Sequence, residues 1–267
     1  MPYVTRDGVS IYFECVGTGY PLVLHTGGGG DGRMWQQAGY VDALSGDFQC
    51  ILMDHRGHGR SGKPTEVKSH EMEEYAADVV AIMDAVGVSR AAFWGYSAGN
   101  PVGLCLAAAH PARVAGLVLL GGVIETDYCD PSAQEYQQEW ADIGRERGVG
   151  SFVSGMRAHD GMDFPRWFME QMESTEGEMF ALQVEGALRW RGPWSLFDQI
   201  TCPVLLIAGE LEDPDEDNAK VAAALPTASS VTIEGLGHVG AFVRSDLTLT
   251  HALPFLRDLN QSTKQSA

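Results

Sequence analysis

Hydrophobic and polar positions alternate along the chain in two different patterns. Short, continuous apolar runs of strand length recur between longer amphipathic stretches with helical spacing. The apolar runs occupy residues 21–25, 49–53, 91–95, 114–120, 203–208 and 229–233. The amphipathic stretches occupy residues 34–45, 71–87, 98–110, 215–225 and 246–259. Because a strand that is apolar on both sides is buried on both faces, this alternation predicts an α/β fold: a mostly parallel sheet with helices on both faces.

The N-terminal residues follow another pattern. Residues 2–6 and 9–16 are short alternating runs, and the Asp7-Gly8 dipeptide between them is a typical hairpin turn. We therefore expect two antiparallel strands at one edge of the sheet.

One long interval, residues 123–197, contains no convincing strand and is rich in large apolar side chains. These are Trp140, Met156, Met162, Phe164, Trp167, Phe168, Met169, Met172, Met179, Phe180, Trp190 and Trp194. We expect a helical lid here, inserted into a core made of residues 1–122 and 198–267. Most of these side chains are expected to pack within the lid and a few to face a pocket, because ligand pockets are mostly apolar.

The length and the net charge of the chain limit the kinds of protein to which it can belong. The chain has 267 residues, 45% of them hydrophobic, which is enough for one large core. Its formal net charge of −18 is unfavourable for binding nucleic acid or an anionic membrane. No apolar run reaches membrane-spanning length, and the N-terminus lacks the basic and apolar regions of a secretory signal. We therefore expect a cytoplasmic protein. The sequence does not decide whether it forms a homo-oligomer.

The cysteines give no sign of disulfides or of a metal site. They are odd in number and scattered: Cys15, Cys50, Cys105, Cys129 and Cys202. No pair has the spacing of zinc ligands, so we expect reduced thiols in the core. Asp54, His55 and His58 are close in sequence, but their spacing matches no metal motif.

The segment Gly95-Tyr96-Ser97-Ala98-Gly99 stands where an apolar run ends and a helical stretch begins. A sharp strand-to-helix turn would hold Ser97 in a strained conformation with its hydroxyl exposed at the carboxyl edge of the sheet. Glycine on either side would avoid a clash, and the N–H of Ala98 would point at a developing oxyanion. The five-residue motif alone is a weak signal, but its strand-to-helix context strengthens it.

Four segments together carry a resemblance to a known family. They are "LHTGGGGDGRMW" (24–35), "MDHRGHGRS" (53–61), "GYSAG" (95–99) and "GLGHVGAF" (235–242). The chain resembles the α/β-hydrolase superfamily over nearly its whole length, including the family's order of serine, acid and histidine. The resemblance implies a Ser-His-acid triad and no cofactor.

A serine hydroxyl needs a base within hydrogen-bond reach to act as a nucleophile. His238 follows the last predicted strand, on a loop that would return to the edge where Ser97 lies, and it matches the family's histidine position. We expect the histidines of the other family-like loops, His25, His55 and His58, to hold those loops by hydrogen bonds. His159, within the expected lid, is a weaker candidate for a substrate contact.

The family's acid lies on the loop after the strand at 203–208, and here two residues compete. Counting three positions from Gly209, the usual spacing in the family, gives Glu212. Asp213 is instead the residue type usual at that place. The sequence leaves both open, with Asp215 as a minor third.

The second oxyanion donor in this family lies after the strand at 21–25, where four glycines stand at 27–30. By position we expect Gly27, with Gly28 next, to supply an N–H beside that of Ala98. A plain flexible loop is the alternative; a phosphate cradle is disfavoured because no Lys-Ser/Thr pair follows. We call the expected strand-to-helix turn at Ser97 the elbow. The family usually has a small residue just after this elbow, where this chain has Asn100.

The sequence thus predicts a serine hydrolase that cleaves a carboxylic ester or lactone of a small, partly apolar molecule through an acyl-enzyme. Related families use the same site to hydrolyse C–C bonds or to make peracids. Epoxide hydrolases and haloalkane dehalogenases of this fold need an aspartate nucleophile, and Ser97 argues against both. A small-molecule receptor on the same fold is the non-enzymatic alternative.

Overall fold

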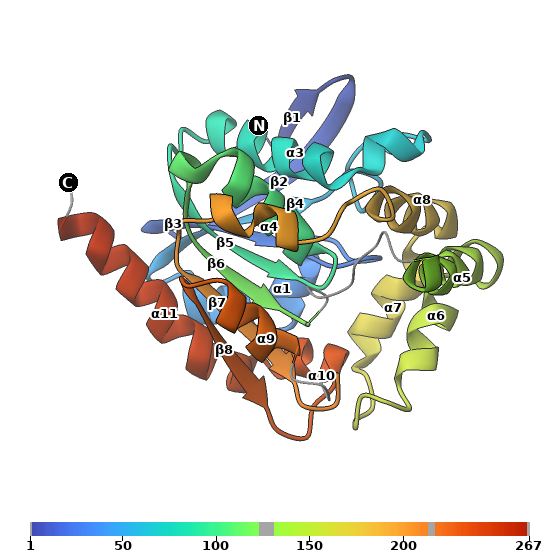
Figure 1. The fold of residues 1–267 in the computed structure, drawn as a ribbon. Coiled ribbons are helices and arrows are strands. Elements are labelled where there is room, and N and C mark those ends of the chain that lie inside the picture. The colour runs from blue at the N-terminus through green and yellow to red at the C-terminus, as the bar shows by residue number, and fades with distance from the viewer. Residues whose placement is uncertain (1, 123–130, 213–216, 266–267) are drawn as a thin grey trace.

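The computed structural model describes residues 2–122, 131–212 and 217–265, and a single β-sheet forms its centre. Within those residues the sheet has eight strands in the order β1-β2-β4-β3-β5-β6-β7-β8 (Figure 1). Their bounds are β1 Tyr3–Arg6, β2 Val9–Val16, β3 Tyr20–His25, β4 Phe48–Asp54, β5 Ala91–Tyr96, β6 Val114–Leu120, β7 Val204–Gly209 and β8 Ala228–Ile233. β1 and β2 are antiparallel to their neighbours, and the other pairs are parallel. The predicted sheet, with its N-terminal hairpin at one edge, is confirmed.

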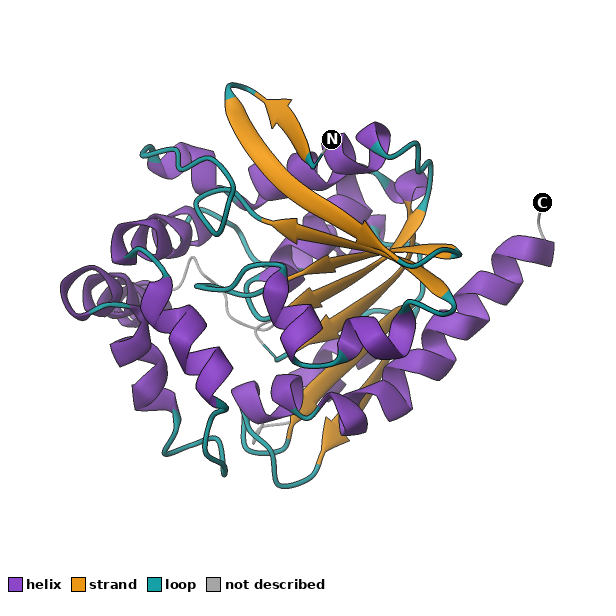
Figure 2. Cartoon of the chain, turned by 180° about the vertical axis from the view of Figure 1, so that it is seen from behind, coloured by secondary structure: helices purple, strands orange, loops and turns teal. Residues whose placement is uncertain are grey.

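Helices cover both faces of the sheet, as the apolar strands require (Figure 2). The α-helices of this core are α1 Arg33–Gln37, α2 Tyr40–Leu44, α3 Met72–Ala85, α4 Gly99–Ala109, α9 Asp217–Ala224, α10 His238–Val243 and α11 Ser245–Gln265. Short 3₁₀ helices are η1 Val67–His70, η2 Pro111–Arg113 and η3 Trp194–Gln199. In β3, Val23 packs with α3, α4 and α9, whereas Leu22 and Leu24 pack with α1, α2, α10 and α11. Side chains of one strand thus alternate between two buried layers.

Four helices lie between β6 and β7 in the chain: α5 Pro131–Arg147, α6 Val149–Met156, α7 Arg166–Ser174 and α8 Gly177–Ala187. We call them the α5–α8 segment. They gather beyond the carboxyl ends of the strands, to the right of the sheet in Figure 1. The Thr175 hydroxyl, just after α7, donates a 2.6 Å hydrogen bond to the carbonyl of Gly29, in the loop after β3. The described part of 123–197 contains no strand, in line with the prediction.

Two expectations need correction. The helix expected over 34–45 is broken, because Gly39 adopts a φ of 84° and separates α1 from α2. The cysteines are also not uniformly buried: Cys50, Cys105 and Cys202 are, but Cys15 is exposed on β2, because the hairpin leaves one of its sides uncovered. Cys129 lies outside the described residues.

Candidate active site

Ser97 occupies a sharp turn between β5 and α4, at the middle of the sheet. Its φ is 53°, in the left-handed region that residues other than glycine rarely adopt. A Cβ on Gly95 would lie 2.7 Å from the Gly99 carbonyl oxygen, and one on Gly99 would lie 2.7 Å from that of His25. Both glycines are therefore required by close backbone contacts, and the serine hydroxyl is held out of the turn.

His238, at the start of α10, lies between Ser97 and Glu212. Its Nε2 is 2.9 Å from Ser97 Oγ, and its Nδ1 is 2.6 Å from Glu212 Oε2. A carboxylate only accepts, so Nδ1 carries the proton and Nε2 accepts from the serine hydroxyl. The other oxygen of Glu212 accepts the backbone N–H of Gly209 at 2.7 Å, which fixes the carboxylate on its loop. Of the two acids left open, Glu212 is the one joined to His238; Asp213 lies outside the described residues, as does Asp215.

The surroundings of His238 make it a stronger base than a free imidazole. Burial lowers the pKa of His238, but the charge and hydrogen bond of Glu212, with a further contribution from Asp160, outweigh burial and raise it above the usual 6.5. The imidazole stacks on the Tyr96 ring at 5.1 Å, and Tyr96 in turn stacks on Phe242. The ring is thus held on one face by aromatic packing and at Nδ1 by a carboxylate.

Asp160, between α6 and α7, is a residue that the sequence reasoning did not single out. Its buried carboxylate accepts hydrogen bonds from the backbone N–H groups of Val239 at 2.9 Å and Gly240 at 3.0 Å. Its own carbonyl accepts the N–H of Gly237. Burial raises the pKa of Asp160, although its bonds to Gly240 and Val239 oppose this rise. The α5–α8 segment therefore holds the helix end that carries His238.

The glycine loop after β3 lies against the elbow. His25 pairs with Gly95 in the sheet, which brings the residues after β3 beside Ser97. A Cβ on Gly27 would lie 2.6 Å from Ser97 Cβ, so no side chain fits there. The next residue, Gly28, faces the α5–α8 segment, where a Cβ would lie 3.1 Å from the ring of Phe180. Ala98, the N-cap residue of α4, follows the serine directly, so the backbones of Gly27 and Ala98 both lie next to Ser97.

Asn100 braces the elbow rather than lining the pocket. It is fully buried in the first turn of α4, and its side-chain amide donates to the carbonyls of Leu120 at 3.0 Å and Gly121 at 2.8 Å. These carbonyls end β6, which pairs with the strand before Ser97. The departure from a small residue thus adds a tie between the elbow helix and the neighbouring strand.

Four histidines form a buried cluster beneath the glycine loop. The rings of His25 and His55 stack at 5.2 Å, and those of His55 and His58 lie 4.0 Å apart. His58 accepts the N–H of Gly29, and the ring of His25 bonds the carbonyl of Thr26. Burial lowers the pKa of His25 and of His58 to about 4. His70 is also buried, and burial together with the neighbouring histidines lowers the pKa of His55 well below its usual value. As expected for His25, His55 and His58, hydrogen bonds join these side chains to loop groups.

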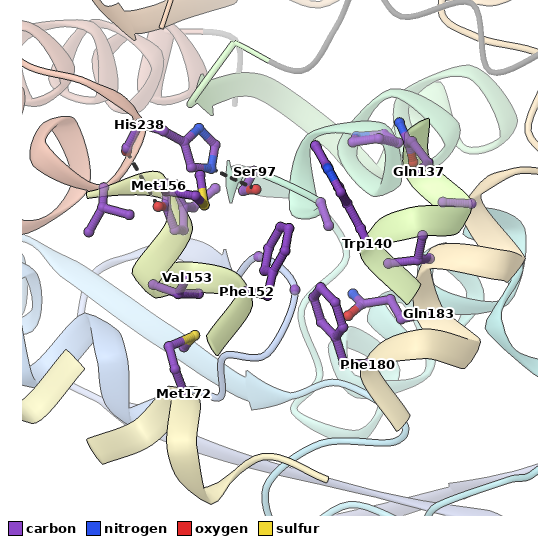
Figure 3. Close-up of a pocket in the computed structure, with 18 of the residues that line it drawn as sticks. Ser97, Gln137, Trp140, Phe152, Val153, Met156, Met172, Phe180, Gln183 and His238 are labelled. Atoms are coloured by element: carbon purple, nitrogen blue, oxygen red, sulfur yellow. Dashed lines mark hydrogen bonds between the residues drawn. The ribbon is translucent and has the colours of Figure 1, made fainter. Parts of the chain in front are cut away.

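A pocket of about 290 Å³ opens above Ser97 (Figure 3). The sheet side supplies Ser97, His238 and the glycine loop, and the α5–α8 segment supplies Trp140, Phe152 and Phe180. A second pocket of about 410 Å³ adjoins it and shares Trp140, Phe152, Met156, Glu212 and His238. That pocket is lined toward the surface by exposed Leu211 and Tyr136 and by His159. The site therefore has an apolar interior and a wider approach beside α5.

Among the described residues, no group of three or more His, Cys, Asp or Glu side chains is arranged to hold a metal ion. In the same part of the chain, no helix has the length and apolar character needed to cross a membrane.

Comparison with known proteins agrees with the fold. Residues 20–245 match the family model of the alpha/beta hydrolase fold, so the chain belongs to the α/β-hydrolase family. It is 29% identical to a putative carbamate hydrolase, RutD, of Azorhizobium caulinodans, over 98% of this chain and 100% of that protein. It is 31% identical to rhodomycin D methylesterase DauP of Streptomyces sp. (strain C5), over 70% of this chain and 60% of the relative. It superposes on a thermophilic esterase from Thermogutta terrifontis with a TM-score of 0.82 at 23% identity, over 97% of each chain, a likeness of fold.

Proposed function

We infer that the protein is a serine hydrolase that cleaves a carboxylic ester or lactone of a small, partly apolar molecule. The observation that carries this proposal is the continuous series of hydrogen bonds from Glu212 through His238 to Ser97. Relatives named as a putative carbamate hydrolase and as a methylesterase support hydrolysis as the class of reaction.

In this proposal Ser97 Oγ attacks the carbonyl carbon, and His238 Nε2 takes the hydroxyl proton. Glu212 stabilises the imidazolium that forms. The N–H groups of Gly27 and Ala98 stabilise the oxyanion, with Gly28 as the alternative in the loop. His238 then gives its proton to the leaving alkoxide. A water molecule, deprotonated by the same histidine, cleaves the acyl-enzyme and restores Ser97.

The α5–α8 segment acts as a lid in this scheme. Its side chains form the pocket wall opposite Ser97, and the aromatic rings of Trp140, Phe152 and Phe180 keep water from the acyl-enzyme except along the approach beside α5. The small cavity favours short acyl or alcohol groups over long chains.

The test combines turnover with covalent labelling. Purified protein should hydrolyse short-chain p-nitrophenyl esters, and a fluorophosphonate probe should label Ser97 alone, as located by peptide mapping. Ser97→Ala should abolish both signals while its circular dichroism spectrum and melting temperature stay unchanged. Labelling of another serine, or a Ser97→Ala protein that still turns over the esters, would refute the assignment. Absence of both turnover and labelling would instead point to a receptor.

A further inference from the structure

Resting on the proposed ester hydrolysis, we propose that Gln137 and Gln183 form a polar subsite that recognises a neutral hydrogen-bonding group of the substrate. The preferred substrate is then an ester with a keto, hydroxyl or amide group, separated from the scissile carbonyl by a short apolar spacer. The proposal names a substrate class that the catalytic residues alone do not define.

The pocket is divided into zones of different chemistry. Ser97 and His238 occupy one end (Figure 3). Next come three aromatic rings in series: Trp140 contacts Phe152 at 5.2 Å, and Phe152 contacts Phe180 at 5.1 Å. On the side away from His238 stand the two glutamine side chains (Figure 3). An extended substrate with its carbonyl at Ser97 would pass the rings before reaching the amides.

Helical spacing explains why both amides face the same cavity. Gln137 and Trp140 are three residues apart on α5, and Phe180 and Gln183 are three residues apart on α8. Residues at this spacing share a helix face. Each helix therefore presents one aromatic ring and one amide to the pocket.

Of the two glutamines, Gln183 gives the stronger evidence for a polar subsite. This residue is only 3% exposed, and its Oε1 has no hydrogen-bond partner within 3.5 Å among the described residues, although the His55 imidazole is near enough to interact with the side chain. The NH2 group of the same side chain is the part that can donate to a keto oxygen of a ligand, since Oε1 only accepts. Oε1 of Gln183 lies 3.5 Å from the position that a Cβ on Gly28 would take. The amide is thus close to the oxyanion loop, which limits the spacer to a few atoms.

The charge of the lining selects a neutral group over an anion. No lysine or arginine lies among the described residues that line this pocket, and its one carboxylate, Glu212, is bound to His238. A carboxylate on the substrate would lose its hydration without gaining a counter-ion. A keto or amide group needs only the donors and acceptors that glutamine supplies.

Three matched p-nitrophenyl esters test the proposal: levulinate, isocaproate and hemisuccinate. They carry a ketone, an isosteric branched alkyl group and a carboxylate at the same place. The wild type should prefer levulinate to isocaproate in kcat/KM by about three- to tenfold, and should use hemisuccinate at least about 100-fold less well than levulinate. Acetoxyacetone and isobutyl acetate, followed by pH-stat, place the same pair of groups on the alcohol side. Ser97→Ala supplies the uncatalysed rate.

Gln183→Leu and Gln137→Leu keep the side-chain shape but remove the amide. Each should reduce the keto preference to about onefold while isocaproate is still cleaved, which also shows that the variant folds. Gln171→Leu is the matched control, because Gln171 is a buried glutamine on α7 whose amide does not line the pocket, and it should keep the preference. If the wild type shows no keto preference on either side, or both pocket variants retain it, the subsite is wrong while ester hydrolysis stands. If no ester is cleaved at all, both proposals fall.

Discussion

The carboxylate of Asp160 accepts the backbone N–H of Val239 at 2.9 Å, although 79 residues separate the two in sequence. Val239 directly follows His238, and Gly240 bonds the other carboxylate oxygen. The position of the imidazole therefore depends on a side chain from the α5–α8 segment as well as on Glu212.

The first prediction concerns Asp160. Its negative charge contributes to the raised pKa of His238, so Asp160→Asn should lower that pKa. Because the reaction needs neutral His238, the acid limb of the kcat/KM–pH profile should move to lower pH. The asparagine also has a single acceptor for two N–H groups, so kcat at neutral pH should fall by about tenfold. The control is Asp163→Asn, an exposed acid of the same loop. A lower melting temperature with an unmoved acid limb would make Asp160 a stabilising residue only.

The second prediction separates the two acids that the sequence left open. Glu212→Gln should lower kcat by about 10⁴-fold, because the amide no longer stabilises the imidazolium and permits the wrong tautomer. Asp213→Asn should retain nearly full kcat. Both proteins are first checked for folding by circular dichroism. Equal losses in the two variants, or full activity in both, would remove Glu212 from the triad.

The third prediction concerns acid stability. The folded-state pKa of His25 and of His58 is lowered to about 4, below the value near 6.5 of the unfolded chain. The unfolded chain therefore binds protons that the folded state does not, and the free energy of unfolding should fall as pH falls from 6.5 toward 4. The slope is about 1.4 kcal/mol per pH unit for each such histidine. Urea unfolding of His58→Gln between about pH 5 and pH 7 should show a shallower slope by that amount. His251→Gln, an exposed histidine on α11, should not change it.

The fourth prediction addresses the brace at the elbow. Asn100→Ala leaves the Leu120 and Gly121 carbonyls without their side-chain donor, which should lower the free energy of unfolding by about 1–3 kcal/mol. Asn100→Asp should be worse, because it places a carboxylate against two carbonyl oxygens in a buried site. Chemical denaturation of the wild type, the alanine variant and the aspartate variant measures both changes in the free energy of unfolding. An aspartate variant as stable as the alanine variant would show that the two amide hydrogen bonds are not what stabilises this turn.

The strands and the elbow were predictable because each depends on local sequence. Continuous apolar runs such as 114–120 permit few structures other than a strand buried on both faces. The glycines around Ser97 indicate backbone contacts so close that a side chain at those positions would clash. The break between α1 and α2 is not predictable in this way, because Gly39 inside an amphipathic stretch does not by itself reveal a left-handed φ.

The supporting residues of the site could not be read from the sequence. Asp160 acts on backbone N–H groups, which every residue except proline carries, so no pattern marks its partner. Gln137 and Gln183 lie in a segment rich in large apolar side chains, and no sequence pattern distinguishes a glutamine that lines a pocket from one on the surface. Glu212 and Asp213 are adjacent carboxylates, and only the three-dimensional path of the loop separates them.

Two of the hydrogen bonds that tie the α5–α8 segment to the core join Thr175 to Gly29 and Asp160 to the backbone after His238. One tie meets the loop proposed to hold the oxyanion, and the other meets the base. For protein engineering this has a practical consequence. A chimera that exchanges these helices for those of a relative would change the pocket wall and also detach both sides of the catalytic apparatus. Grafts should therefore carry an aspartate and a threonine in the equivalent places, or the recipient will lose activity even on substrates that both parents accept.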